Sequence, residues 1–339
     1  MLTTRLFLQR LLFPGLFVAG SLSVAKEAPE PILLGAGDHT YEWVSGWGEL
    51  PDGKPLGNTH GCIVVDSRDR IYVNTDSENA VVVYDTDGKV LDTWGEELAG
   101  GLHGMCLAEE DGQEILWLAH IGLHKVFKAT LEGEILQTIE YPEESGLYQS
   151  ADQYRPTAVV VGPDGDLYVA DGYSTSWIHR FHSDGTYVSS FGGRGRGLGM
   201  LQTPHGMLLD DRGEEPALLV ADRENHRLQT FGLDGAAHRI VTGMLRRPCN
   251  VYPAPDGSGD LVVADLAGRV TILSGDDELV LQLGDNPDPG KRARNDVPAD
   301  QCKDGEFVSP HSAAWDSKGN LYVMDWLAFG RVSKLRRLR

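Results

Sequence analysis

Six copies of one unit fill most of this 339-residue chain. Each copy contains a short apolar segment, a second segment like LYVAD, a polar turn, a third segment like RLQTF, and a fourth that several copies end with an aromatic residue and glycine. Four short strands repeated every ~40 to 60 residues are the signature of propeller blades. The repeat therefore predicts an all-β fold, a six-bladed β-propeller. The copies begin at His60, His103, Thr157, His205, Cys249 and His311.

The ends of the repeat array indicate how the ring closes. The sixth copy stops before its fourth strand, whereas the segment 41–48, YEWVSGWG, has the aromatic-glycine ending of such a strand and no partner of its own. Joining the two ends removes an exposed sheet edge. We therefore expect an N-terminal strand to complete the last blade, and residues 26–339 to form a single propeller domain.

The first 25 residues have the pattern of a signal peptide. Arg5 and Arg10 precede the apolar run LLFPGLFVAGSLSVA, which ends in a small-x-small pattern. A single membrane anchor is the alternative, but the run is shorter than the ~20 residues of a spanning helix and contains Pro14 and Gly15. We expect an exported protein, periplasmic or extracellular, with no membrane span after removal of the signal.

Charge and cysteine content narrow the partners and the covalent framework. The net charge of −20 argues against nucleic acid and anionic lipid as partners. Four cysteines in an exported chain allow two disulfides in any of three pairings, and the sequence does not choose among them. The cysteines are Cys62, Cys106, Cys249 and Cys302.

Histidines at alternate strand starts form the candidate metal site. The first strand of each propeller blade lines the central axis, so every second blade would place His103, His205 and His311 around it with threefold symmetry. Three converging imidazoles with a fourth direction open to solvent are typical of catalytic zinc. His60 shares the repeat position but belongs to the other set, with Thr157 and Cys249. The remaining histidines are expected to be hydrogen-bonded surface residues: His39, His120, His124, His179, His182, His226 and His238.

Two turns after second strands should face the same mouth of the channel. They carry Tyr173 and Arg223. Tyr173 could act as a general base if neighbouring cations lower its pKa from about 10. Arg223 could supply such a cation, or bind a substrate carboxylate in bidentate fashion. Both residue types also occur in propeller loops without a function.

The glycine-rich segment FGGRGRGLGMLQTPHGMLLD has two interpretations. It resembles an NHL repeat, in which a glycine-rich turn leads to a strand that starts with Pro-x-Gly. A nucleotide-binding loop is the alternative, but the chain enters a strand through Pro204 and not a helix, so the helix N-terminus that would hold a phosphate is missing.

Most of the mature chain resembles one family, the peptidyl-α-hydroxyglycine α-amidating lyases, which are six-bladed propellers. The resemblance is carried by GLHGMCL, LYVADGYSTSWIHRF, TPHGMLL, LLVADRENHRLQTF and SPHSAAWD. It implies that His103, His205 and His311 bind zinc, that Tyr173 is the base and that Arg223 acts on the substrate. The implied reaction cleaves R-CO-NH-CH(OH)-COOH, an α-hydroxyglycine at the end of a peptide or small molecule, into an amide and glyoxylate. We expect the enzyme to be a monomer.

The chain departs from this family at several positions. An active-site arginine of the first blade is replaced by the turn Asn74–Ser77, which carries Asp76. The family's calcium would use backbone carbonyls matching Cys62 and Met105 and an aspartate where this chain has Ser312, whose hydroxyl lacks the charge that a hard cation favours. Ser174 replaces a cysteine of the family, so the disulfide pattern is not shared.

Other functions remain open. A related zinc lyase or hydrolase could act on a small hydroxy-carboxylate, and a non-catalytic NHL propeller could bind peptides or proteins. A lactonase-type propeller would need a calcium held by several carboxylates, which the strand starts do not offer. The insertion 285–307 should lie over the same mouth, where its cations could replace the missing arginine or form a solvated loop. These cations are Lys291, Arg292 and Arg294.

Overall fold

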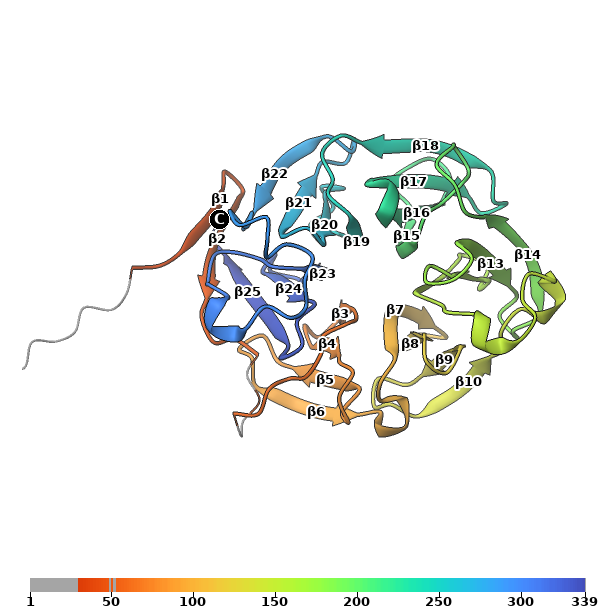
Figure 1. The fold of residues 1–339 in the computed structure, drawn as a ribbon, viewed down its shortest axis with the longest axis horizontal. Coiled ribbons are helices and arrows are strands. Elements are labelled where there is room, and N and C mark those ends of the chain that lie inside the picture. The colour runs from red at the N-terminus through yellow and green to blue at the C-terminus, as the bar shows by residue number, and fades with distance from the viewer. Residues whose placement is uncertain (1–29, 49, 51–52, 339) are drawn as a thin grey trace, which may run out of the picture. The chain divides into compact units, whose positions relative to one another are not determined.

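A ring of six antiparallel sheets makes up the described structure (Figure 1). The computed structural model describes residues 30–48, 50 and 53–338, and the signal peptide expected at 1–25 lies outside them. The six sheets occupy residues 33–337 and confirm the predicted all-β, six-bladed propeller. Within the described residues, no helix is both long and apolar enough to span a bilayer.

Blades 1 to 5 are four-strand meanders, and the first strand of each blade lies nearest the axis. Blades 1 and 2 contain β3 (Ile63–Val65), β4 (Ile71–Asn74), β5 (Val81–Tyr84), β6 (Val90–Trp94), β7 (Leu102–Glu110), β8 (Gln113–His120), β9 (Lys125–Ala129) and β10 (Ile135–Ile139). Blades 3 and 4 contain β11 (Ala158–Val161), β12 (Leu167–Ala170), β13 (Trp177–Phe181), β14 (Tyr187–Gly192), β15 (Pro204–Asp210), β16 (Ala217–Asp222), β17 (Arg227–Gly232) and β18 (Ala237–Thr242).

The last two blades follow the same order. They contain β19 (Pro248–Pro253), β20 (Leu261–Asp265), β21 (Arg269–Leu273), β22 (Leu279–Leu283), β23 (Pro310–Trp315), β24 (Leu321–Asp325) and β25 (Arg331–Arg337). Short 3-10 turns occur at η1 (Glu96–Leu98), η2 (Glu143–Ser145), η3 (Ala151–Gln153), η4 (Arg223–Asn225) and η5 (Ala299–Gln301).

The sixth blade takes its fourth strand from the start of the propeller. β2 (His39–Val44) pairs with β25 in antiparallel register, with Trp43 opposite Leu335. Residues 41–44 of the segment expected to supply this strand lie in β2, whereas residues 45–48 form a turn. β1 (Leu33–Ala36) adds a fifth strand outside β2, which the sequence analysis did not predict because its side chains are mostly exposed and show no alternating pattern.

The core is divided among the interfaces between neighbouring blades. Six buried apolar clusters each combine side chains from two adjacent blades, and the ring therefore has no single centre of packing. Middle strands such as β4, β12 and β20 are buried on both faces, whereas outer strands such as β6 and β18 are largely exposed. This arrangement explains why segments like LYVAD read as unbroken apolar runs.

The structure contains neither of the two disulfides that the cysteine count allowed. All four cysteines are free thiols, with Cys62 and Cys249 buried at the starts of the first strands of blades 1 and 5. The fold is held by packing and hydrogen bonding, and these two thiols lie next to the axis.

Three histidines expected at the surface are buried instead, namely His39, His120 and His179. His179 lies in β13, where one ring nitrogen is 2.7 Å from the Tyr148 hydroxyl and the other is 2.8 Å from Ser190 Oγ. For His179 the expectation was wrong because this face of β13 packs against Tyr148 and Tyr154, in the segment that precedes blade 3. Burial lowers the pKa of His179 to about 3.

His179 should make the stability of the fold depend on pH. Its pKa is about 3 in the folded chain and about 6.5 when unfolded, so between these values the unfolded state binds the extra proton. Stability is therefore fully present above pH 6.5 and falls on acidification, by up to about 1.4 kcal/mol per pH unit from this residue. In urea titrations at pH 7, 5 and 4, His179→Gln should have a shallower pH slope than the natural chain. The exposed control His238→Gln should keep the original slope, and equal slopes for all three proteins would contradict the prediction.

Candidate metal centre

Breaks in strand pairing aim the three predicted histidines at the axis. The register between the first and second strands shifts between Leu102 and Gly104 in blade 2, between Pro204 and Met207 in blade 4, and between Pro310 and Ser312 in blade 6. Each histidine lies inside such a break, which behaves as a β-bulge and turns its side chain out of the ladder. His103, His205 and His311 are at most 2% exposed.

Each of these imidazoles is oriented by a backbone carbonyl of the next blade. Nδ1 lies 2.8 Å from Thr157 O for His103, 2.9 Å from Cys249 O for His205 and 2.6 Å from Gly61 O for His311. A carbonyl can only accept, so Nδ1 carries the proton and Nε2 presents its lone pair to the axis. The three blades that carry none of these histidines thus contribute to the site through the backbone carbonyls of Thr157, Cys249 and Gly61.

Glycine after the histidine allows this approach in two of the blades. A Cβ at Gly104 would lie 2.5 Å from Thr157 O, and a Cβ at Gly206 would lie 2.5 Å from Cys249 O. Both carbonyls are the acceptors of the preceding histidine. In each His-Gly pair, the histidine can act as a ligand, and the missing Cβ of the glycine leaves room for the carbonyl that accepts a hydrogen bond from that histidine.

A fourth histidine joins the cluster. The ring centroids of His103, His205 and His311 are 4.6 to 5.1 Å apart, and His60 lies 4.9 Å from His103 and 5.0 Å from His311. The sequence analysis left His60 out because it breaks the alternation of blades. The imidazoles at the axis are so close together that the odd or even number of a blade does not determine whether its histidine belongs to the site.

The Tyr173 hydroxyl lies within the histidine cluster. It is 2.9 Å from His205 Nε2, 3.0 Å from His60 Nε2 and 3.2 Å from His103 Nε2. Arg223 Nη1 donates to the same hydroxyl at 3.2 Å, and its guanidinium lies over the tyrosine ring at 5.3 Å. The structure brings together all five residues predicted for the zinc site and the chemistry.

Burial dominates the electrostatics of the cluster. Desolvation lowers the pKa of His103, His205 and His311 well below the ordinary value, and the charge of Arg223 lowers them further, so these imidazoles are neutral near pH 7. Burial also raises the pKa of Tyr173 to about 12, although Arg223 opposes this shift. Arg223 alone therefore does not meet the condition set for Tyr173 as a base, a pKa lowered by neighbouring cations, because desolvation outweighs the arginine.

The donor set fits a transition-metal cation. Two groups hold their ligand atoms within 4.8 Å of one another, one made of His60, His103 and His311 and one of His205, Cys249 and His311. His311 Nε2 is buried with no hydrogen-bond partner in the described structure. Three Nε2 lone pairs converge, yet Tyr173 offers a single hydroxyl proton to satisfy them. A cation that accepts imidazole nitrogen, such as zinc, would balance this excess of acceptors.

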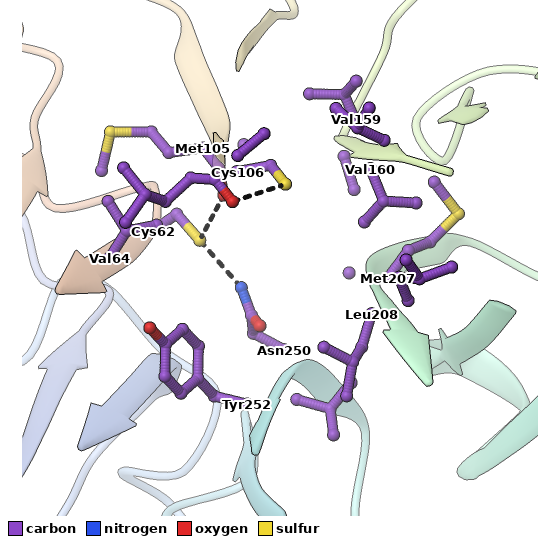
Figure 2. A pocket seen from close by; sticks show the side chains of 18 of the residues that line it. Cys62, Val64, Met105, Cys106, Val159, Val160, Met207, Leu208, Asn250 and Tyr252 are labelled. Carbon is purple, nitrogen blue, oxygen red and sulfur yellow. Dashed lines mark hydrogen bonds between the residues drawn. The ribbon is translucent and has the colours of Figure 1, made fainter. Parts of the chain in front are cut away.

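The residues proposed for calcium do not fit that ion. Below the histidines, a channel of about 480 Å³ is lined by the first strands, as Figure 2 shows. There the Cys62 thiol lies 3.7 Å from Met105 O and 3.6 Å from Ser312 Oγ, and it accepts a hydrogen bond from Asn250 at 2.9 Å. Glu109 is the one carboxylate among the described lining residues, and its side chain is exposed. A thiol and an amide supply no charge for calcium.

The side chain of Asp76 and the cations of the insertion form hydrogen bonds with residues close to them. Asp76 accepts a hydrogen bond from Asn58 at 2.6 Å, and burial raises the pKa of its carboxyl. The cations of the insertion bond within the insertion itself: Lys291 donates to Gln301 O, Arg292 to Asn286 O, and Arg294 to Asp296. The insertion therefore corresponds to the solvated-loop alternative and not to a replacement for the missing arginine.

Sequence reasoning also missed Trp326. Its ring lies 5.3 Å from that of His60, and its Nε1 is buried without a partner in the part of the chain that the structure describes. The signal was available in the repeat, because Trp326 follows Asp325 as Arg223 follows Asp222.

Comparisons with known proteins support the resemblance to NHL-repeat propellers and to the amidating lyases. A family model described as "NHL repeat" matches residues 154–181. The chain is 25% identical over 317 residues to peptidyl-alpha-hydroxyglycine alpha-amidating lyase 2 of Drosophila melanogaster, a match that covers 89% of this chain and 73% of that protein. It is also 32% identical over 165 residues to peptidyl-glycine alpha-amidating monooxygenase B of Xenopus laevis, covering 45% of this chain and 18% of that longer protein.

Among solved structures, a streptogramin B lyase superposes with a TM-score of 0.58 over 90% of this chain and 98% of its own. The identity is 15%, so this likeness concerns the propeller fold. Together, the NHL match and the amidating lyases confirm that the chain is an NHL-repeat propeller resembling that family.

Proposed function

We propose that this chain is an exported, zinc-dependent lyase that cleaves a carbinolamide, R-CO-NH-CH(OH)-COO⁻, into the amide R-CO-NH₂ and glyoxylate. The observation that carries the proposal is that the neutral Nε2 atoms of His103, His205 and His311 lie close together. The Tyr173 hydroxyl bonds the first two and faces Arg223, whereas His311 Nε2 has no partner among the described residues. The similarity to proteins named as amidating lyases gives the reaction class.

His103, His205 and His311 would hold the zinc through Nε2. Zinc in such a site acts as a Lewis acid that lowers the pKa of a hydroxyl group. The carbonyl partners of the three Nδ1 atoms keep the rings in place and in the correct tautomer. Because burial keeps the imidazoles neutral, the ligands would not have to lose a proton near pH 7.

Tyr173 would take the proton of the substrate hydroxyl. Its hydroxyl is at the centre of the cluster, within hydrogen-bond reach of anything bound there. In the chain alone its pKa of about 12 keeps it protonated at pH 7, so its role as a base depends on positive charge beyond that of Arg223. When the proton leaves, the C-O⁻ group becomes an aldehyde, and the electron pair of the C-N bond leaves with the amide nitrogen.

Arg223 would bind the substrate carboxylate and fix the orientation of the breaking bond. Its side chain is 12% exposed, and Glu224 holds Nε at 2.9 Å while Nη1 reaches Tyr173. A guanidinium restrained in this way can pair with a carboxylate without first being ordered. The base and the carboxylate anchor would thus lie on adjacent blades.

The test is incubation of the zinc-loaded protein with α-hydroxyhippurate while glyoxylate and benzamide are measured. We expect the two products in equal amounts, and none from protein treated with a chelator. A zinc-containing protein that releases no glyoxylate would overturn the lyase reaction. A folded protein without zinc would instead favour the peptide-binding scaffold.

A further inference from the structure

Trp326 carries an unused hydrogen-bond donor beside the candidate site. Its indole Nε1 is buried and has no partner among the described residues, although buried donors are almost always paired. Its ring lies 5.3 Å from His60, and the His60 ring stacks at 5.7 Å on Tyr173. The three rings therefore form a continuous aromatic wall that ends at the tyrosine hydroxyl.

The repeat shows that this position faces the axis. In blade 4, Asp222 accepts the N-H of Gln202 through Oδ1 and the Arg227 guanidinium through Oδ2, and the next residue, Arg223, reaches Tyr173. In blade 6, Asp325 accepts the backbone N-H groups of Val308 and Ser309 through Oδ1 and the Arg331 guanidinium through Oδ2. Trp326 follows Asp325 and is the counterpart of Arg223.

The backbone around Trp326 is firmly held. Its N-H donates to Ser309 O at 2.8 Å, and the following residue, Leu327, is fully buried. Thr59 donates to Asp325 O and so ties this turn to blade 1. A side chain on so fixed a turn keeps its direction, which is what a substrate contact requires.

Other buried polar atoms without a partner lie at the same end of the strands. Among the described residues they include Asn58 Oδ1, Asn225 Oδ1, Arg246 Nε, Arg247 Nε and His311 Nε2. All belong to turns before first strands or after second strands, or to the histidine cluster itself. Donors and acceptors left open at one mouth point to a polar ligand that completes them.

We infer that Trp326 binds the acyl oxygen of the substrate's amide group and stabilises the departing amide. This inference rests on the proposed lyase function. With the carboxylate at Arg223 in blade 4, the amide arm of the same carbon would extend toward blade 6. As the C-N bond breaks, its electron pair moves to the amide nitrogen and is shared with the acyl oxygen. The indole N-H is a neutral donor for that charge, and a proton then returns to nitrogen to give R-CO-NH₂.

This assignment gives the chain a preference for substrates with an uncharged acyl group. In blade 1, where the resembling family has an arginine, the turn carries Asp76, which disfavours a second anion at the mouth. The wall of His60 and Trp326 instead offers an aromatic surface and a single neutral donor. Aromatic or apolar acyl groups therefore match this side of the site better than acidic ones.

Trp326→Phe removes the N-H and keeps an aromatic ring, and Trp94→Phe is the matched control. Trp94 also carries a buried Nε1 with no partner in the described ranges, but it lies in β6, the outer strand of blade 1. For hippurate, which lacks the reacting hydroxyl, we expect Kd by calorimetry to rise about threefold in Trp326→Phe. We expect kcat with α-hydroxyhippurate to fall about 10- to 100-fold, between the loss of a neutral hydrogen bond and that of an oxyanion donor. Trp94→Phe should match the natural chain in both.

A leaving-group series separates this role from a structural one. An electron-withdrawing 4-nitrobenzoyl group stabilises the departing amide by itself, so the kcat defect of Trp326→Phe should shrink with that substrate. A defect of the same size for both substrates, or unchanged Kd and kcat, would overturn the inference while leaving the lyase reaction in place. If the natural chain bound hippurate through Trp326 but released no glyoxylate, the proposed function would fail and the contact would stand.

Discussion

His205→Ala is expected to abolish most zinc binding and to slow glyoxylate release by roughly 10³-fold or more, because a Lewis acid supplies several kcal/mol to such a reaction. His205 is 2% exposed, and its Nδ1 bonds Cys249 O, so its ring is held with Nε2 facing the cluster. Two imidazoles hold zinc far more weakly than three. Metal content by mass spectrometry and the glyoxylate assay measure the two effects.

The control for this substitution is His238→Ala. His238 is exposed in β18, on the outer edge of blade 4, the blade that also carries His205. It should keep about one zinc per chain and full activity. If purified natural chain contained no zinc, or if His205→Ala kept both zinc and activity, the metal assignment would be rejected.

Tyr173→Phe is expected to retain zinc and lose about 10² to 10⁴ in kcat, the usual contribution of a general base. The hydroxyl contacts three imidazoles and Arg223, whereas the ring contributes the stacking on His60, which phenylalanine preserves. Hippurate should therefore bind the variant within a few fold of the natural chain. Steady-state kinetics, zinc analysis and calorimetry on the same preparation separate the chemical step from binding and from the metal.

Tyr187→Phe provides the comparison for this variant. The Tyr187 hydroxyl contacts Ser190 within β14, the outer strand of blade 3. This strand lies away from the axis, so loss of the hydroxyl should leave kcat unchanged. A Tyr173→Phe protein with zinc bound and kcat within a few fold of the natural chain would exclude tyrosine as the base. His60, which lies 3.0 Å from the same hydroxyl, would then be the next residue to substitute.

The sequence was sufficient for the ring and for most of the site because both follow from the repeat. Each blade repeats the same apolar strands, and each predicted histidine occupies the same bulge, so one alignment of the copies fixes their relative positions. The turn after the second strand placed Tyr173 and Arg223 on the same mouth by similar reasoning. These features are periodic, and periodicity can be read without coordinates.

What could not be predicted depends on distances that the repeat does not encode. His60 joins the cluster because the mouth is narrow, which no count of blades reveals. The pKa of Tyr173 depends on the balance between desolvation and the charge of Arg223, and only the charge could be inferred before the burial of the ring was known. The Cys62 thiol beside Met105 O, in place of a charged ligand, became evident only from the channel lining.

The carbonyl bonds of the three histidines have a mechanical consequence. His103 of blade 2 is bonded to blade 3, His205 of blade 4 to blade 5, and His311 of blade 6 to blade 1. A single ion shared by these imidazoles would link three separate pairs of neighbouring blades. Separation of the two blades in any pair would displace one imidazole, so the metal site would depend on an intact ring of blades.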